Sequence, residues 1–188
     1  MKIKILLFII YLILFSFNSI AQNSERKFKI HTLAFYNLEN LFDTINDVNK
    51  NDEASPIMEI KFNRSGIYKQ KIANMAKVIS EIGYDVTNRP PTIVGICEVE
   101  NRKVVEDLIS DEKLKNYNYG IVHYESPDDR GIDVGLIFNK DVFKVKNSNS
   151  HDVFITGNNS SKRRNTRDQL VVSGLLDGEL IHIIVNHW

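Results

Sequence analysis

The residues best suited to chemistry in this chain stand where predicted strands begin or end. Glu98 follows the apolar run 93–97, and a carboxylate at the end of a buried strand suits Mg²⁺, which prefers oxygen ligands. Arg130 and Arg167 each precede a predicted strand, and a planar guanidinium makes paired hydrogen bonds to phosphate. The plainer interpretations are a solvated acid and surface ion pairs between each arginine and a neighbouring acid.

A histidine and an asparagine also lie beside strands. His187 follows the apolar run 181–185 and could act as an acid, a hydrogen-bond donor to phosphate or a metal ligand. Asn37 follows the first predicted strand, where it could position a metal-bound water, donate to a phosphate oxygen or cap a turn. His123 is an outside candidate, and the role of Asp133 stays open.

The elements that must hold these residues follow from the pattern of apolar side chains. Apolar residues at helical spacing predict a helix over 66–82 that ends at Gly83, and Asn101 can cap a second helix through residue 110. Asp177-Gly178 predicts a tight hairpin turn. Strands are expected over 28–36, 92–97, 117–124, 131–139, 142–146, 169–176 and 179–185, with loops over 43–65 and 147–166.

The N-terminus has the layout of a secretory signal peptide over residues 1–21. Lys2 and Lys4 precede the apolar run 5–17, and Ser19 and Ala21 are small residues at the expected cleavage site. An uncleaved anchor is the alternative. We expect a secreted or periplasmic protein, with residues 22–188 as one domain and no stable membrane span after cleavage.

Composition limits the partners of this domain. Removing residues 1–21 takes away two lysines and no acid, so the net charge goes from 0 to −2. A near-neutral domain does not bind nucleic acid by bulk charge, so an anionic substrate must be held locally by arginines or a metal ion. Cys97 is the only cysteine and lies in an apolar run, which predicts a core residue and excludes an internal disulfide. No protein partner is evident from the sequence.

Five motifs in order carry a resemblance to a known family. The segments are YNLENLFD at 36–43, GICEVEN at 95–101, RGIDVGLIF at 130–138, TRD at 166–168 and VNHW at 185–188. The chain resembles the endonuclease/exonuclease/phosphatase (DNase I-like) superfamily, and within it the secreted bacterial branch. The likeness covers residues 30–188, and the ordered set is quite specific.

The resemblance implies an α/β fold, a four-layer sandwich of two mixed sheets flanked by helices, and Mg²⁺- or Mn²⁺-dependent phosphoester hydrolysis. It implies that Glu98 binds the metal, with Asn37 beside it. It also implies that Arg167 reaches the substrate phosphate and that His187 contacts the scissile phosphate and assists the leaving group. Arg130 falls in a family motif and is a second candidate for substrate phosphate.

The family pattern continues with an Asp-x-Asn motif and a final Asp-His pair, and neither follows His187 in these 188 residues. We therefore expect a C-terminally incomplete domain that is inactive or nearly so by itself. The favoured function is a secreted endonuclease-type phosphodiesterase acting on DNA or RNA. The alternatives are a lipid or sugar-phosphate phosphoesterase of the same fold, and a non-catalytic phosphate-binding module.

Overall fold

The computed structural model describes residues 28–48, 50–156 and 163–188. The chain divides into two compact units, Met1–Ile30 and His31–Trp188. The predicted signal segment 1–21 lies outside the described residues, and the account below concerns the second unit. Among the described residues, none of the helices has the length and apolar character needed to cross a membrane.

The first sheet is mixed and has the strand order β1-β2-β4-β3. Its strands are β1 (Leu33–Leu41), β2 (Ile93–Val99), β3 (Tyr119–His123) and β4 (Asp133–Asn139). β1 and β2 are parallel, while β2–β4 and β3–β4 are antiparallel. β1 starts and ends about five residues later than the strand predicted over 28–36. As a result, Asn37 lies within the strand and not after it.

The second sheet has the order β5-β8-β9 and is antiparallel over the described residues. Its strands are β5 (Phe143–His151), β8 (Gln169–Leu176) and β9 (Glu179–Val185). The short strand predicted over 142–146 is present, but it is longer than expected, because residues 147–151 continue β5 alongside β8. The predicted loop 147–166 also contains the paired strands β6 (Ile155–Thr156) and β7 (Arg163–Arg164), while residues 157–162 between them lie outside the described residues.

The two predicted helices are present, and their ends follow local chemistry. α3 (Arg64–Glu81) is followed by Gly83, which takes the left-handed conformation at φ 66°. α5 (Arg102–Ile109) is capped by Asn101, whose side chain accepts a hydrogen bond of 3.1 Å from the Val104 amide.

Short helical segments complete the fold. They are η1 (Asp52–Ala54), α2 (Pro56–Glu59), α4 (Tyr84–Thr87) and η2 (Lys115–Tyr117). The region 43–65 therefore contains two short helical turns where a continuous loop was expected.

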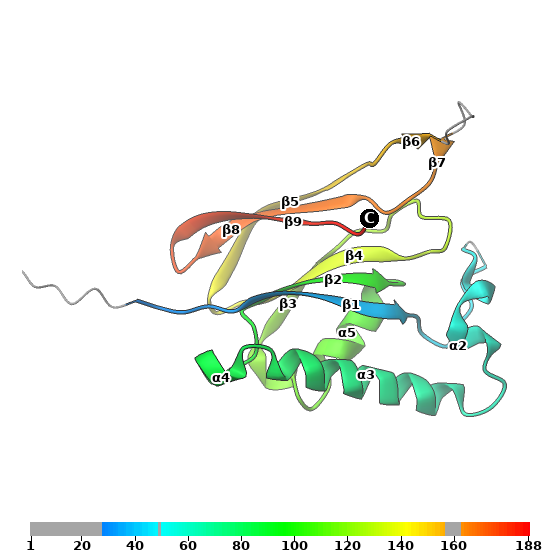
Figure 1. Ribbon diagram of the computed structural model, residues 1–188, viewed down its shortest axis with the longest axis horizontal. Coiled ribbons are helices and arrows are strands. Elements are labelled where there is room, and N and C mark those ends of the chain that lie inside the picture. Colours follow the sequence, from blue (N-terminus) through cyan, green and yellow to red (C-terminus); the bar gives the residue numbers. More distant parts are fainter. Residues whose placement is uncertain (1–27, 49, 157–162) are drawn as a thin grey trace, which may run out of the picture. The chain divides into compact units, whose positions relative to one another are not determined.

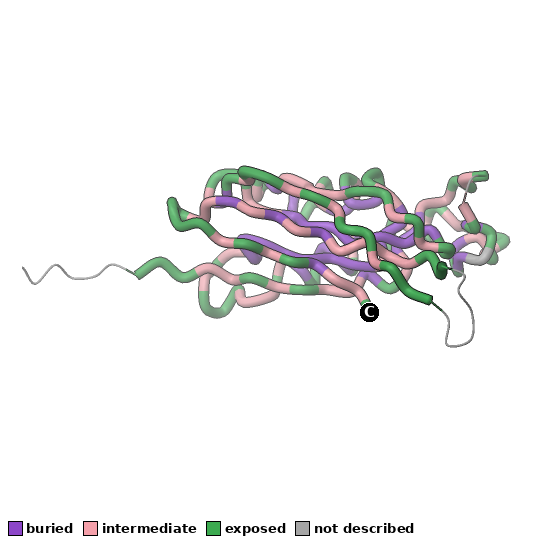
Figure 2. Tube along the Cα trace, turned by 90° about the horizontal axis from the view of Figure 1, so that it is seen from above, coloured by how far each residue is buried: buried purple, intermediate pink, exposed green. Residues whose placement is uncertain are grey.

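Two apolar layers hold the sandwich together. One lies between the first sheet and helices α3 and α5, and the other lies between the two sheets. Figure 1 shows the helices on one side of the first sheet and β5, β8 and β9 on the other. In Figure 2 the buried residues follow the central strands. The predicted α/β sandwich is confirmed. Its described part comprises helices, first sheet and second sheet, and Cys97 is fully buried between the sheets.

Candidate active site

The carboxyl ends of β1 and β2 are distorted side by side. Glu39, Asn40 and Glu98 all have left-handed backbones, with φ of 51°, 56° and 59°. The pairing register shifts at this point between β1 and β2, and again between β2 and β4. Left-handed conformations cost about 1–3 kcal/mol each in residues other than glycine, and such strain gathers at functional sites. The distortion marks this edge of the first sheet as a candidate site.

The bulged backbone directs the Glu98 carboxylate toward the second sheet. One oxygen, Oε2, accepts a hydrogen bond of 3.0 Å from the Asn40 amide. The other oxygen, Oε1, lies 3.4 Å from Nε2 of His187. His187 is the second residue after the end of β9. The structure thus brings together two of the predicted site residues, Glu98 and His187, from strands of different sheets. Both side chains are mostly buried.

Asn37 forms a turn inside β1. Its Oδ1 accepts a hydrogen bond of 2.6 Å from the Glu39 amide, and its Cα pairs with that of Cys97, the residue before Glu98. The turn-capping alternative therefore describes the contact that this side chain makes. The oxygen keeps a second lone pair, so the expected role beside a metal stays a prediction.

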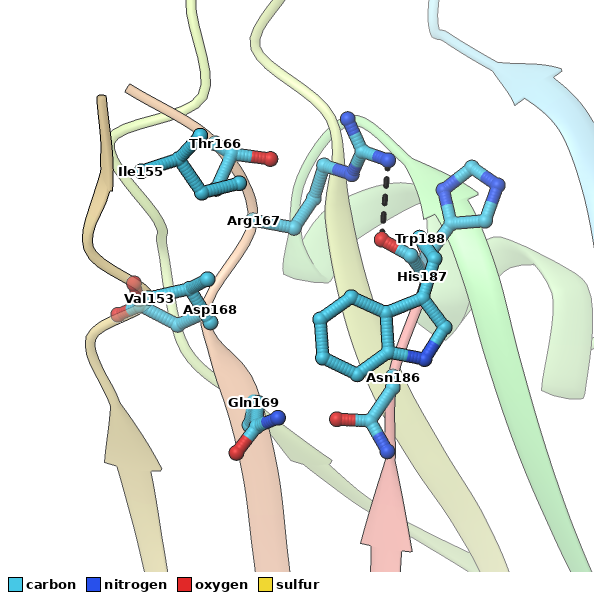
Figure 3. A pocket seen from close by; sticks show the side chains of 9 residues that line it. All are labelled: Val153, Ile155, Thr166, Arg167, Asp168, Gln169, Asn186, His187 and Trp188. Atoms are coloured by element: carbon cyan, nitrogen blue, oxygen red, sulfur yellow. Dashed lines mark hydrogen bonds between the residues drawn. The ribbon is translucent and has the colours of Figure 1, made fainter. Parts of the chain in front are cut away.

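Arg167 is held by two bonds within the protein. Nη1 donates to Oδ2 of Asp128 at 3.1 Å, and Nη2 donates to the main-chain oxygen of His187 at 2.9 Å. Figure 3 shows the second bond beside a cavity of about 120 Å³. The cavity is lined by residues 166–169 at the start of β8, residues 186–188 after β9, and Val153 and Ile155. Arg167 therefore fixes the backbone that presents His187.

Arg130 is more exposed than Arg167 and lies on the opposite side of the same acid. Its Nε is 3.7 Å from Oδ1 of Asp128, and its amide donates to that oxygen at 3.0 Å. A second cavity, of about 450 Å³, is lined by Arg130, Arg164 and Arg167 together with Asp128 and Asp129. Three guanidinium groups around one cavity suit a phosphate group, as the two predicted arginines imply.

The environment of His187 favours its neutral form. Its pKa is lowered, first by burial and then by the positive charges of Arg167 and Arg130, while Glu98 and Asp128 oppose the shift. A neutral imidazole can act as a hydrogen-bond acceptor or a metal ligand as well as a donor.

Sequence reasoning missed two residues of this region. Asp128 is a polar loop residue two positions before Arg130, and only the fold shows that both arginines meet it. Lys71 of α3 donates to the main-chain oxygens of Glu39 and Asn40, so it supports the left-handed turn. Burial lowers the pKa of Lys71 against the raising effect of Glu39 and Glu98.

Arg164 also belongs to this region. Its basic run at 162–164 favours a solvated loop, with contact to a polyanion as the alternative, and Arg164 lines the cavity of about 450 Å³. A run of basic residues gives no local sign that one of them lines a cavity. The fold places it there by pairing β6 with β7.

A metal ion at Glu98 would have few protein ligands. The carboxylate of Glu98 and the amide oxygen of Asn37 are donors of the kind that Mg²⁺ prefers, and Mg²⁺ usually keeps several waters. Among the described residues, the one set of three His, Asp or Glu side chains with metal-ligand spacing is His123, Glu125 and Asp133, and it does not include Glu98. The donor set at Glu98 thus fits a loosely held hard cation.

Comparison with known families decides the identity of this arrangement. The model of the Endonuclease/Exonuclease/phosphatase family matches residues 32–188. The chain belongs to the endonuclease/exonuclease/phosphatase family. Members of this family are hydrolases that act on phosphoesters. No curated protein matches the chain.

Several solved structures are similar to this chain. An endonuclease/exonuclease/phosphatase from Bacteroides vulgatus is 15% identical with a TM-score of 0.46, covering 80% of this chain and 49% of that one. A humanized D. rerio TDP2 is 15% identical with a TM-score of 0.42, covering 80% and 44%. A mannosyl-6-phosphatase from Bacteroides thetaiotaomicron is 13% identical with a TM-score of 0.44, covering 82% and 50%. The chain spans about half the length of these proteins or less.

Proposed function

We propose that the site belongs to a divalent-metal-dependent phosphodiesterase, most simply a secreted endonuclease-type hydrolase. The observation that carries the proposal is the approach of Glu98 Oε1 to Nε2 of His187 at 3.4 Å, with Arg167 bound to the His187 backbone. A carboxylate, an imidazole and a guanidinium that converge from both sheets supply the groups that phosphoester hydrolysis needs.

The roles follow from these contacts. Glu98, with Asn37, would hold Mg²⁺ or Mn²⁺, which polarises a phosphoryl oxygen when bound. The neutral imidazole of His187 would donate a hydrogen bond from its N–H to a non-bridging phosphate oxygen. Arg167 and Arg130, on the cavity of about 450 Å³, would hold the phosphate charge.

The test is a substrate panel with the purified full-length protein. Plasmid DNA, RNA, sphingomyelin, a sugar phosphate and bis(4-nitrophenyl) phosphate are each incubated with Mg²⁺, Mn²⁺ or EDTA. We expect metal-dependent hydrolysis that Glu98→Gln and His187→Gln each lower by about 10²-fold or more. Glu112→Gln, at an exposed carboxylate paired with Lys115, is the matched control and keeps full activity. Hydrolysis that survives Glu98→Gln unchanged would refute the assignment.

The substrate class is the open part of the proposal. The near-neutral charge of the domain gives no preference for nucleic acid, so lipid and sugar-phosphate substrates stand beside DNA and RNA in the panel. Preferential cleavage of sphingomyelin or the sugar phosphate would replace the endonuclease assignment without affecting the role of Glu98.

A non-catalytic phosphate-binding module is the second candidate. One observation favours it: among the described residues, Glu98 is not part of a set of three His or carboxylate ligands. Binding of nucleotide or DNA without turnover of any panel member would support this candidate.

We also propose export through a cleaved signal peptide at residues 1–21. The support is the basic start, the apolar run and the small residues before Gln22. Mass spectrometry of the exported protein should find a mature N-terminus at Gln22, and a cell-retained chain starting at Met1 would contradict the proposal.

A further inference from the structure

A histidine and two acids converge on a different part of the first sheet. His123 ends β3, Asp133 begins β4, and Glu125 lies in the segment between them. One ligand atom from each lies within 4.8 Å of the other two. The side chains of His123 and Asp133 are only 2% and 1% exposed, whereas Glu125 reaches solvent. Two of the three side chains are therefore buried, and the third is accessible from solvent.

Two buried atoms of this group face each other without a hydrogen bond. Nε2 of His123 and Oδ2 of Asp133 are 3.2 Å apart, yet within the described residues neither makes a hydrogen bond of acceptable geometry. Leaving a buried polar atom unpaired costs about 1–3 kcal/mol. Ligands of one Zn²⁺ at about 2.0–2.2 Å in tetrahedral geometry lie about 3.3–3.6 Å apart, so a small adjustment would satisfy both atoms with one ion.

The remaining oxygen of Asp133 is already oriented. Oδ1 accepts hydrogen bonds from the amide of Ser126 at 2.8 Å and from its hydroxyl at 2.6 Å. Hydrogen bonds of this kind commonly fix metal-ligating carboxylates. They leave Oδ2 of Asp133 directed at the imidazole of His123, so both ligand atoms are already oriented for an ion.

This group lies on the opposite face of the first sheet from Glu98 and His187. Side chains alternate between faces along a strand, so Asp133 shares the face of Ile137, and His123 shares the face of Ile121. Those two residues pack in the layer between the sheet and the helices. Glu98, in contrast, meets His187 from the second sheet. One ion cannot serve both places.

We propose that His123, Glu125 and Asp133 form a second divalent-cation site suited to Zn²⁺. One imidazole and two carboxylates, with an open position for water, form a donor set that Zn²⁺ accepts. This site is independent of the phosphodiesterase assignment, because it uses none of the residues given a role there.

Lys50 is the competitor for this site. Its Nζ pairs with Glu125 and lies 3.4 Å from the main-chain oxygen of Glu100. Binding of the ion would turn the exposed Glu125 carboxylate from Lys50 to the metal. Lys50→Met should therefore raise the affinity for Zn²⁺ severalfold, because it removes the cation that holds Glu125.

An ion at this site would also stabilise, indirectly, the segment that carries Asp128. It would tie the end of β3 to the start of β4, and the segment between them carries Asp128, which pairs with Arg167 and Arg130. We therefore expect Zn²⁺ to raise the midpoint of thermal unfolding as well as to bind.

Isothermal titration of the untagged chain with Zn²⁺ tests the proposal. We expect one ion per chain in the Glu98→Gln variant, which removes the carboxylate proposed for the first cation. In that variant, the further change Glu125→Gln should weaken binding by about tenfold or more without affecting the fold, because Glu125 is exposed. Ser126→Ala should weaken it by about 10–100-fold through the loss of the bonds that orient Asp133. Glu112→Gln, at an exposed acid paired with Lys115, serves as the control and leaves the affinity unchanged.

Three outcomes would overturn the proposal. They are the absence of saturable Zn²⁺ binding, binding that Glu125→Gln and Ser126→Ala leave unchanged, and binding that only Glu98→Gln abolishes. None of them bears on phosphodiester hydrolysis, which the substrate panel measures separately.

Discussion

Replacing Asp128 with alanine should strongly destabilise the protein through Arg167. The two side chains are 5% and 11% exposed, so the ion pair that they form at 3.1 Å is buried. Removing one partner of a buried pair leaves an uncompensated charge and costs about 3–5 kcal/mol. Arg167 keeps its bond to the His187 main-chain oxygen, which favours the lower end, a loss of about 3 kcal/mol in the free energy of unfolding.

Urea denaturation followed by circular dichroism measures this loss, and two controls isolate its cause. Arg130→Ala removes the exposed partner of the same acid and should cost no more than about 1 kcal/mol. Asp128→Ala combined with Arg167→Met removes both buried charges, so its cost should fall short of the sum of the single changes by about 2 kcal/mol. A cost below about 1 kcal/mol for Asp128→Ala, or a coupling below about 0.5 kcal/mol, would refute the buried-pair argument.

Three further predictions concern residues near the same edge of the first sheet. Burial raises the pKa of Glu100 to about 8, so the folded state binds the extra proton and stability should fall as pH rises from about 4.5 to 8. Denaturation across that range should show a flatter profile for Glu100→Gln, and an unchanged slope would contradict this. Lys71→Met should lower the free energy of unfolding by about 1–3 kcal/mol and speed hydrogen exchange at the Asn40 amide, whereas the exposed Lys77→Met should leave both unchanged. Burial raises the pKa of the Cys97 thiol to about 11, so iodoacetamide at pH 8 should modify it only after unfolding, and labelling of the folded protein at the rate of a free thiol would exclude this environment.

The parts of the fold that depend on local chemistry are predictable from the sequence. The helix up to Gly83 has apolar residues at helical spacing and a terminal glycine that takes the left-handed conformation. The hairpin between β8 and β9 turns at Asp177 and Gly178, both with positive φ, as that dipeptide predicts. At these positions the local sequence determines the backbone conformation, and no contact with a distant segment is needed.

The parts that depend on pairing with distant segments are not predictable in this way. Residues 147–151 are Asn, Ser, Asn, Ser and His, which propensity assigns to a loop, yet β8 offers them partners and they continue β5. The same limit applies to the site. Glu98, Arg167 and His187 can be predicted as candidates, but Asp128 joins the arginines only through folding.

The bond from Arg167 to position 187 goes to a main-chain oxygen, which every amino acid possesses. The bond that holds the backbone at position 187 therefore does not depend on which side chain that position carries. A substitution at position 187 would change the side chain while leaving the bond from the Arg167 guanidinium in place. Replacing the side chain that we propose to contact the phosphate should therefore leave the support of the backbone beneath it intact.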